Sequence, residues 1–161
     1  MSKTAILVEP AKQEIVLTRV FDAPRELVFK TLTDPELITH WWGPRGHSTT
    51  VDKMDLRPGG AWRFVDRDPE GRESGFHGVY HEILAPERVV QTFEWEGAPG
   101  HVLLETMTLE DVGGKTRLTT KSVFQSVADR DAMVATGMES GASESMDRLA
   151  ELIARAGTGK N

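Results

Sequence analysis

The sequence predicts an α+β fold in which a curved antiparallel sheet of about seven strands packs against a long C-terminal helix. Residues 47–125 follow the two-residue period of strands, with turn signals at the spacing of a meander. From Met138 onward, apolar residues return at helical spacing, with charged residues on the opposite face. An amphipathic helix must bury its apolar face. Since the sheet is the only large apolar surface available, the helix is expected to lie across it.

Length and composition indicate one globular domain. The chain has 161 residues, of which 39% are hydrophobic and 27% charged, and this is enough to bury a core without disulfides or metals. No linker or internal repeat divides it. The domain is therefore placed at residues 14–156, and residues 1–13 and 157–161 are expected to be loose termini.

Charge and cysteine content exclude several partners and compartments. The formal net charge of -6 repels a phosphate backbone, so nucleic acid is not expected as a partner. No apolar run is long enough to cross a membrane. The N-terminus lacks the apolar stretch of a signal peptide, and the absence of cysteine excludes a disulfide framework. These features predict a cytoplasmic location.

The N-terminal third predicts one strand followed by a pair of short helices. Residues 14–21 are rich in β-branched and aromatic residues and predict the strand. Asp22-Ala23-Pro24 starts one helix, and Asp34-Pro35-Glu36 starts a second that runs toward Trp41. Gly43-Pro44 ends the second helix.

The middle of the chain predicts six further strands, separated by turns rich in Gly and Pro. Asp68-Pro69-Glu70-Gly71 fits a type I turn, because Asp, Pro and Gly occupy its first, second and fourth positions. The strands are expected at residues 48–56, 61–67, 73–84, 88–96, 101–111 and 115–124. A short helical turn is expected at 128–135, with a break at Gly137.

The apolar stripe of the last helix is uneven. It carries Leu and Ile from Leu149 onward, but small or flexible residues before that point, including Ala142 and Ser145. Small residues let a helix backbone approach a flat sheet closely. If the sheet curves strongly, the same residues would instead form the roof of a cavity. Both interpretations remain open from the sequence.

A cavity in this place would bind an apolar ligand, and aromatic side chains would form its walls. The four tryptophans supply large apolar area and one hydrogen-bond donor each, although they could equally belong to an ordinary core. The sequence does not show which face of each strand lines the cavity. The predicted ligand-binding residues are Trp42, Trp62, Phe64, His77, Trp95, Glu105, Met107, Met138, Ala142, Ser145 and Met146.

The candidates for catalysis are Glu94, Glu105 and His77. A carboxyl buried in a cavity has a raised pKa and can act as a general acid or base, whereas on a half-exposed strand it would simply face water. The sequence contains no nucleophile elbow, phosphate-binding loop or zinc-protease motif.

No metal site or cofactor is predicted. His77 and His81 would lie about 13 Å apart along a strand, which is too far to share one ion. His40 and His47 flank a turn, but no third ligand is evident beside them.

Several motifs occur in an order that resembles a known family. They are Arg19-Val20-Phe21-Asp22-Ala23-Pro24, Leu32-Thr33-Asp34-Pro35-Glu36, Trp41-Trp42-Gly43-Pro44, Leu56-Arg57-Pro58-Gly59-Gly60, Gly78-Val79-Tyr80, Gly137-Met138-Glu139-Ser140-Gly141 and Asp147-Arg148-Leu149. Together they resemble the AHSA1-type branch of the START/Bet v 1-like (SRPBCC) superfamily, named after the activator of Hsp90 ATPase. The resemblance implies a helix-grip fold with a deep cavity. Similar members often carry Trp after the glycine of the last helix, where this chain has Ala142 after Gly141.

Three functions remain open at this stage. The first is a small-molecule binding module with an apolar cavity for a hydrophobic or amphipathic ligand, including an aromatic one. The second is a cyclase- or hydrolase-type enzyme that uses a Glu or His of the cavity. The third, implied by the family name, is an interaction domain that stimulates an Hsp90-type ATPase. A homodimer and a chaperone partner are left open, and no membrane partner is expected.

Overall fold

The computed structural model describes residues 3–158, which form one curved antiparallel sheet of eight strands and four helices. The sheet order is β1-β2-β8-β7-β6-β5-β4-β3. The strands are β1 (Ala5–Leu7), β2 (Glu14–Phe21), β3 (Ser48–Met54), β4 (Ala61–Arg67), β5 (Glu73–Leu84), β6 (Arg88–Trp95), β7 (Val102–Val112) and β8 (Lys115–Val123). The helices are α1 (Arg25–Thr33), α2 (Pro35–Ile38), α3 (Val127–Ala135) and α4 (Met138–Thr158).

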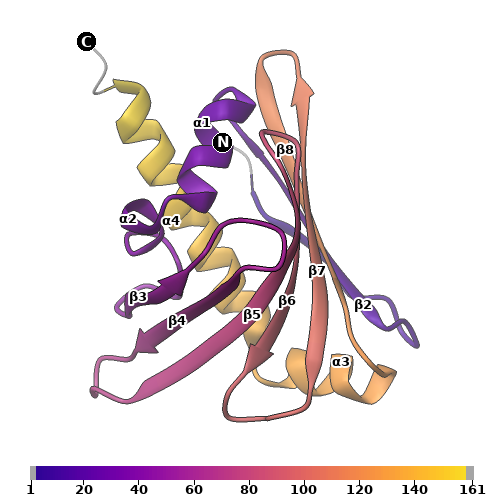
Figure 1. Ribbon diagram of the computed structural model, residues 1–161. Coiled ribbons are helices and arrows are strands. Elements are labelled where there is room, and N and C mark those ends of the chain that lie inside the picture. Colours follow the sequence, from indigo (N-terminus) through magenta and orange to yellow (C-terminus); the bar gives the residue numbers. More distant parts are fainter. Residues whose placement is uncertain (1–2, 159–161) are drawn as a thin grey trace.

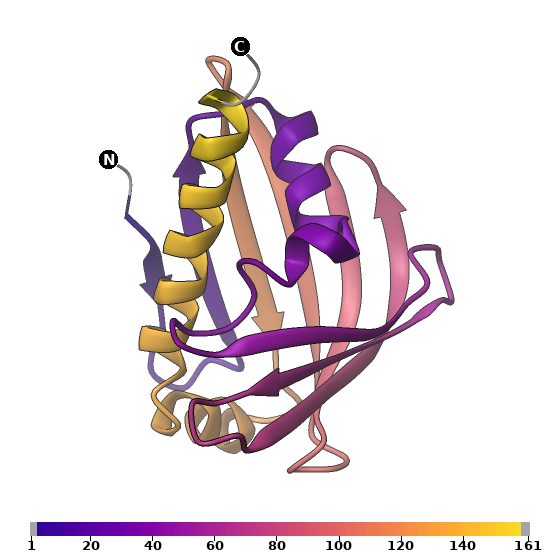
Figure 2. The ribbon, with the colours of Figure 1, turned by 90° about the vertical axis from the view of Figure 1, so that its left-hand side faces the viewer.

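The sheet wraps around α4, which runs along its concave face (Figure 1). Helices α1 and α2 lie on the same side of the sheet as α4, and α3 lies near the start of α4 (Figure 2). The register shifts between Val51 and Lys53 on β3, and again between Tyr80 and Glu82 on β5. Such bulges increase the local twist and bend of a strand, which favours a sheet that curves around a helix.

The main core lies between the concave face and the helices. Burial alternates along β2 and along most of β4, as expected when one face of a strand packs and the other faces solvent. Leu149 and Ile153 of α4 are buried in this core with Val28 of α1. Each fully buried aliphatic side chain contributes about 1.5–3 kcal/mol relative to its exposed state. This half of α4 is therefore the part that fixes the helix to the sheet.

A second, smaller cluster lies at the other end of α4. Ile15, Leu103 and Phe124 are buried together there, and Met133 and Met138 pack against them. The Ser126 side chain caps α3 by accepting a hydrogen bond from the Asp129 N–H. This cluster closes the end of the sheet at which α4 begins.

The element boundaries confirm most of the sequence predictions. The six strands expected between residues 48 and 124 are present, with ends within two residues of those expected. Gly137 separates α3 from α4 and has a φ of 82°, a conformation that favours glycine.

Two differences from the prediction concern the chain ends. Ala5–Leu7, expected within a loose terminus, pairs with β2 and adds an eighth strand. Helix α4 continues to Thr158, and residues 159–161 lie outside the described residues. Across residues 3–158, the structure has no helix with the length and apolar character needed to span a membrane.

Candidate ligand-binding cavity

A cavity of about 210 Å³ lies between α4, the segment after α2 and the concave face of the sheet. Its walls are mainly apolar and aromatic, with a few polar side chains among them. The lining side chains come from the strands of the sheet on one side and from the helices and the segment after α2 on the other, so the cavity lies between these two layers. The lining residues are Leu17, Leu32, Thr33, Ile38, Trp41, Trp42, Met54, Phe64, Tyr80, Val89, Gln91, Glu105, Met107, Leu118, Thr120, Ala142, Ser145 and Met146.

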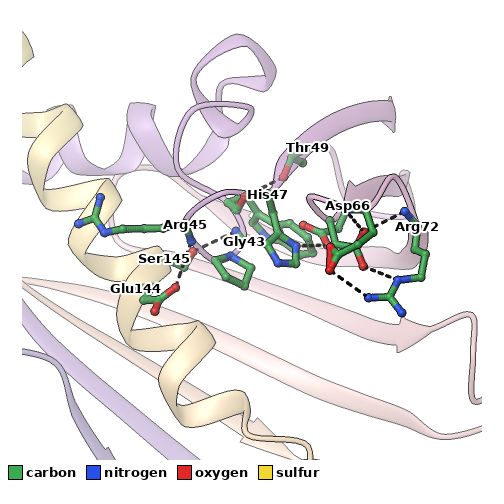
Figure 3. A network of polar contacts seen from close by, with 12 residues as sticks. Gly43, Arg45, His47, Thr49, Asp66, Arg72, Glu144 and Ser145 are labelled. Atoms are coloured by element: carbon green, nitrogen blue, oxygen red, sulfur yellow. Dashed lines mark hydrogen bonds and ion pairs between the residues drawn. The ribbon is translucent and has the colours of Figure 1, made fainter.

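The roof of the cavity is the first half of α4, where the sequence has small residues. Ala142, Ser145 and Met146 all line the cavity. The Ser145 hydroxyl donates to the Trp41 carbonyl at 3.1 Å and accepts from the Gly43 N–H at 3.3 Å. Figure 3 shows this hydroxyl between the helix and the segment after α2. The small side chain thus joins two parts of the cavity wall without filling the space between them.

Charged side chains of α4 hold the same segment from the solvent side. The Arg148 guanidinium donates to a series of backbone carbonyls, those of His40, Trp42, Gly43 and Pro44. Figure 3 also shows the Arg45 N–H donating to the Glu144 carboxylate, at 3.1 Å. Residues 40–45 are therefore attached to the helix along their length, and they form a fixed wall of the cavity.

The end of this segment is fastened to the sheet by Asp66 of β4. His47 Nδ1 lies 2.7 Å from Asp66 Oδ2 (Figure 3), and the Thr49 hydroxyl donates to the Trp42 carbonyl at 2.7 Å. Gly43 has a φ of 94°, and a Cβ at this position would lie 2.9 Å from Asp66 Oδ1. Glycine is therefore needed here for two reasons, its backbone conformation and the close approach of Asp66.

Aromatic packing fixes the tryptophan walls. Trp42 lies edge-on to Phe64 and to Phe76, with ring centroids 5.4 and 5.2 Å apart. Trp41 donates its indole N–H to the Thr31 carbonyl at 2.9 Å. The Trp41 donor is thus already used, and this side chain presents an apolar surface to a ligand.

Glu105 is the acidic residue of the cavity. It lies on β7, where it pairs with Gln91 of β6 and Ser122 of β8. Gln91 Nε2 donates to Glu105 Oε1 at 3.2 Å. Burial raises the pKa of the Glu105 carboxyl to about 7, although hydrogen bonds from Gln91 and Ser122 act in the opposite direction. Glu105 can therefore exchange a proton near neutral pH.

The structure brings together seven of the eleven predicted ligand-binding residues. Two of the other four lie elsewhere in the core. Trp62 is buried beside Phe64 and donates its indole N–H to the Thr92 carbonyl, and Met138 belongs to the cluster near α3. The seven that line the cavity are Trp42, Phe64, Glu105, Met107, Ala142, Ser145 and Met146.

His77 and Trp95, which the sequence also placed at the cavity, are absent from its described lining. On β4, Trp62 and Phe64 face inward, so Arg63 between them faces the convex side of the sheet. His77 of β5 pairs directly with Arg63 and therefore also projects from the convex face. Trp95 ends β6 with 42% of its surface exposed.

The convex face carries a charged cluster around His77. Its Nδ1 lies 2.8 Å from Glu96 and its Nε2 lies 3.3 Å from Glu94, while Arg63 holds Glu96 through two nitrogens. Glu94 therefore faces this cluster and not the cavity. Of the three catalytic candidates, Glu105 alone has its carboxyl in the described cavity. No group of three His, Asp or Glu side chains within residues 3–158 is arranged to hold a metal ion.

Four polar residues of the cavity were not predicted from the sequence: Thr33, Tyr80, Gln91 and Thr120. Gln91 alternates with the apolar Val89 and Phe93, which was a signal that it faces inward. Tyr80 lies beside the bulge of β5, and burial raises the pKa of its hydroxyl, which therefore stays protonated. The pairing of Gln91 with Glu105 depends on strand register, which only the structure supplies.

Comparison with known proteins agrees with this architecture. The sequence profile of the family described as activator of Hsp90 ATPase homolog 1-like protein matches residues 22–154. The chain belongs to this family. No curated protein sequence matches the chain significantly.

Solved structures similar to this AHSA1-like protein share its fold. A Rhodobacter sphaeroides protein is 27% identical with a TM-score of 0.86, over 94% of this chain and 98% of the other. The AHSA1 protein from Silicibacter pomeroyi is 25% identical with a TM-score of 0.72, over 88% and 97%. Protein Ms6760 from Mycobacterium smegmatis is 22% identical with a TM-score of 0.85, over 93% and 96%.

Proposed function

We propose that this AHSA1-like protein binds a small hydrophobic or amphipathic molecule in the cavity beneath α4. The observation that carries the proposal is the cavity itself, whose aromatic walls are fixed and whose roof is made of small or flexible residues. A cavity of about 150 Å³ lined by apolar side chains can hold benzene. The 210 Å³ found here is therefore suited to a ligand with a single ring and a short substituent.

Filling the cavity from its roof tests the proposal. Ala142→Trp places an indole in the space, so a small apolar reporter dye should bind at least about 10-fold more weakly than it binds the wild type. Overpacking a filled core typically costs about 1–3 kcal/mol, whereas a ring that enters open space costs little. The melting temperature of the variant should therefore stay equal or rise.

Ala154→Trp is the matched control, because Ala154 lies on the exposed face of α4. It should leave dye binding unchanged. A well-folded Ala142→Trp variant that binds the dye normally would place the ligand site elsewhere. A strongly destabilised one would mean that the space near Ala142 is already packed.

An acid–base enzyme is the second candidate, and the raised pKa of Glu105 favours it. Glu94 and His77 receive no such support, because they face the convex cluster. If Glu105 is catalytic, Glu105→Gln should abolish turnover of a substrate while retaining its binding. Stimulation of an Hsp90-type ATPase, suggested by the family description, is tested directly by adding the purified protein to that ATPase.

A further inference from the structure

We propose that the ligand of this cavity is a monocation, an amine attached to a single apolar ring, and that Glu105 is its counter-ion and specificity-determining residue. The inference rests on the proposed binding function. It adds the charge and the chemical class of the ligand, which the apolar walls alone do not specify. It starts from the one acidic side chain among the described residues of the lining.

Glu105 lacks a positively charged neighbour in the described cavity. Gln91 on β6 and Ser122 on β8 flank it across the sheet, and both are neutral. The titratable group contributed by β5 is Tyr80, whose burial keeps its hydroxyl protonated and uncharged. The helices and the strands β2, β3 and β4 contribute only uncharged side chains to the described lining. These are Ala142, Ser145 and Met146 of α4, Leu32 and Thr33 of α1, Ile38 of α2, Trp41 and Trp42 of the following segment, Leu17 of β2, Met54 of β3 and Phe64 of β4. No Lys, Arg or His is among the described lining residues.

Two arginines on the elements that surround the cavity make their described contacts with other groups and not with Glu105. Arg19 of β2 is buried on the same side of the sheet, but its guanidinium contacts Asp147 of α4 and the Thr4 hydroxyl. Arg148 is directed to the carbonyls of residues 40–44. Glu105 is therefore a carboxyl in apolar surroundings that has hydrogen bonds but no counter-ion in the described cavity.

An ammonium group would supply what this carboxyl lacks. Buried charges in proteins are normally paired, because desolvating an isolated carboxylate is costly. A ligand ammonium beside Glu105 would form a charge-assisted hydrogen bond, and the side-chain carbonyl of Gln91 is a neutral acceptor next to it. The surrounding indole and phenyl rings add cation–π attraction to an ammonium and a fitting surface for an aromatic ring.

The same features discriminate against other ligands of this size. An acid would bring a second negative charge next to Glu105, and the net charge of -6 opposes its approach. A neutral alcohol can donate a hydrogen bond to Glu105, but it leaves the carboxylate without a counter-ion at pH 8. Because the raised pKa falls when an ammonium binds, an amine should also displace a proton from Glu105 at pH 6.

Three ligands that share a ring test the inference by isothermal titration calorimetry at pH 8: 2-phenylethylamine, 2-phenylethanol and 3-phenylpropionate. We expect the amine to bind at least about 10-fold more tightly than the alcohol, and the acid to bind most weakly. In Glu105→Gln, which keeps the size of the side chain, the amine should lose this advantage while the alcohol binds as before. At pH 6, the heat of amine binding should depend on the ionisation enthalpy of the buffer in the wild type and not in the variant.

The outcomes separate this inference from the proposed function. Equal binding of amine and alcohol to the wild type would overturn the charge inference and leave the cavity as a binding site. An amine preference that survives in Glu105→Gln would also overturn it, because the counter-ion would then be another group. If none of the three ligands nor the reporter dye binds, the proposed function fails and the inference fails with it.

Discussion

Two glutamates on opposite sides of the same sheet show how the fold divides its chemistry. Glu105 faces the concave side, where burial raises the pKa of its carboxyl to about 7. Glu96, next to the end of β6, faces the convex side, where the Arg63 and His77 side chains lower the pKa of its carboxyl to about 2. Gly75 leaves room for that cluster, since a Cβ there would lie 2.2 Å from Glu96 Oε1.

The difference comes from surroundings and not from residue type. Glu96 is paired with a guanidinium at the surface and is stably ionised, so it serves as part of a solvent-facing ion network. Glu105 meets only neutral hydrogen-bond partners in the described cavity and lies near its titration midpoint at neutral pH. Near neutral pH, the ionisation state of a group held near its midpoint changes with pH or with a bound ligand, whereas Glu96 stays ionised.

The largest expected effect is the change in the free energy of unfolding when Glu105 is replaced by Gln. A folded-state pKa raised from 4.5 to about 7 means that the native state binds more protons than the unfolded state between these values. Stability therefore falls as the pH rises from about 4.5 to 7, by at most about 3 kcal/mol at 1.36 kcal/mol per pKa unit. Glu105→Gln removes this cost. It should raise the unfolding free energy by up to about 3 kcal/mol at pH 8 and by much less at pH 5.

Urea denaturation at several pH values, compared between wild type and Glu105→Gln, measures this effect. The difference in unfolding free energy should grow with pH and level off above pH 7. A constant difference from pH 4 to 9 would mean that Glu105 is ionised normally, and that the two glutamates do not differ as described.

A smaller effect is expected from the neighbour of Glu105. The Gln91 amide donates to the ionised carboxyl and thereby lowers its pKa. Gln91→Leu removes the donor, so the midpoint of Glu105 should rise further, by about one pH unit or 1.4 kcal/mol. Carbon-detected NMR titration of the Glu105 carboxyl gives the midpoint directly. An unchanged midpoint would contradict the assigned role of Gln91. Thr92→Leu is the control, because it removes a polar side chain from the same strand but outside the cavity lining.

The smallest effect is expected on the convex face. Glu96→Gln breaks the pairs with Arg63 and His77, but surface ion pairs contribute little to stability. The melting temperature at pH 7 should fall by no more than about 3 °C. The difference in melting temperature between wild type and variant should shrink below pH 4.5, because Glu96 of the wild type is then protonated, first in the unfolded state and at lower pH in the folded state. It should also shrink in 1 M salt, which screens the ion pairs. A larger loss in thermal scans that persists in 1 M salt would show that Glu96 is more than a surface partner.

Local patterns were sufficient to predict most secondary structure and part of the cavity. The two-residue period of the strands and the stripe of α4 depend on neighbours in sequence, so they could be read before any contact was known. Ala142 and Ser145 could be expected at the roof of the cavity because the roof is one continuous helix, and both line the cavity. The face of the sheet from which His77 projects could not be predicted in the same way, because it depends on the register between β4 and β5, which pairs His77 with Arg63.

The sequence by itself determined the class of fold, the small residues of the roof and the glycines at the turns, because each follows from local periodicity or backbone freedom. The tertiary structure alone decided which of three glutamates faces the apolar cavity. Glu94, Glu96 and Glu105 are chemically the same group, and all three lie in or next to strands. Register and sheet curvature place Glu105 beside Gln91 in an apolar space and Glu96 beside Arg63 at the surface. These long-range pairings set the dielectric and the nearby charges, which in turn set what each carboxyl can do.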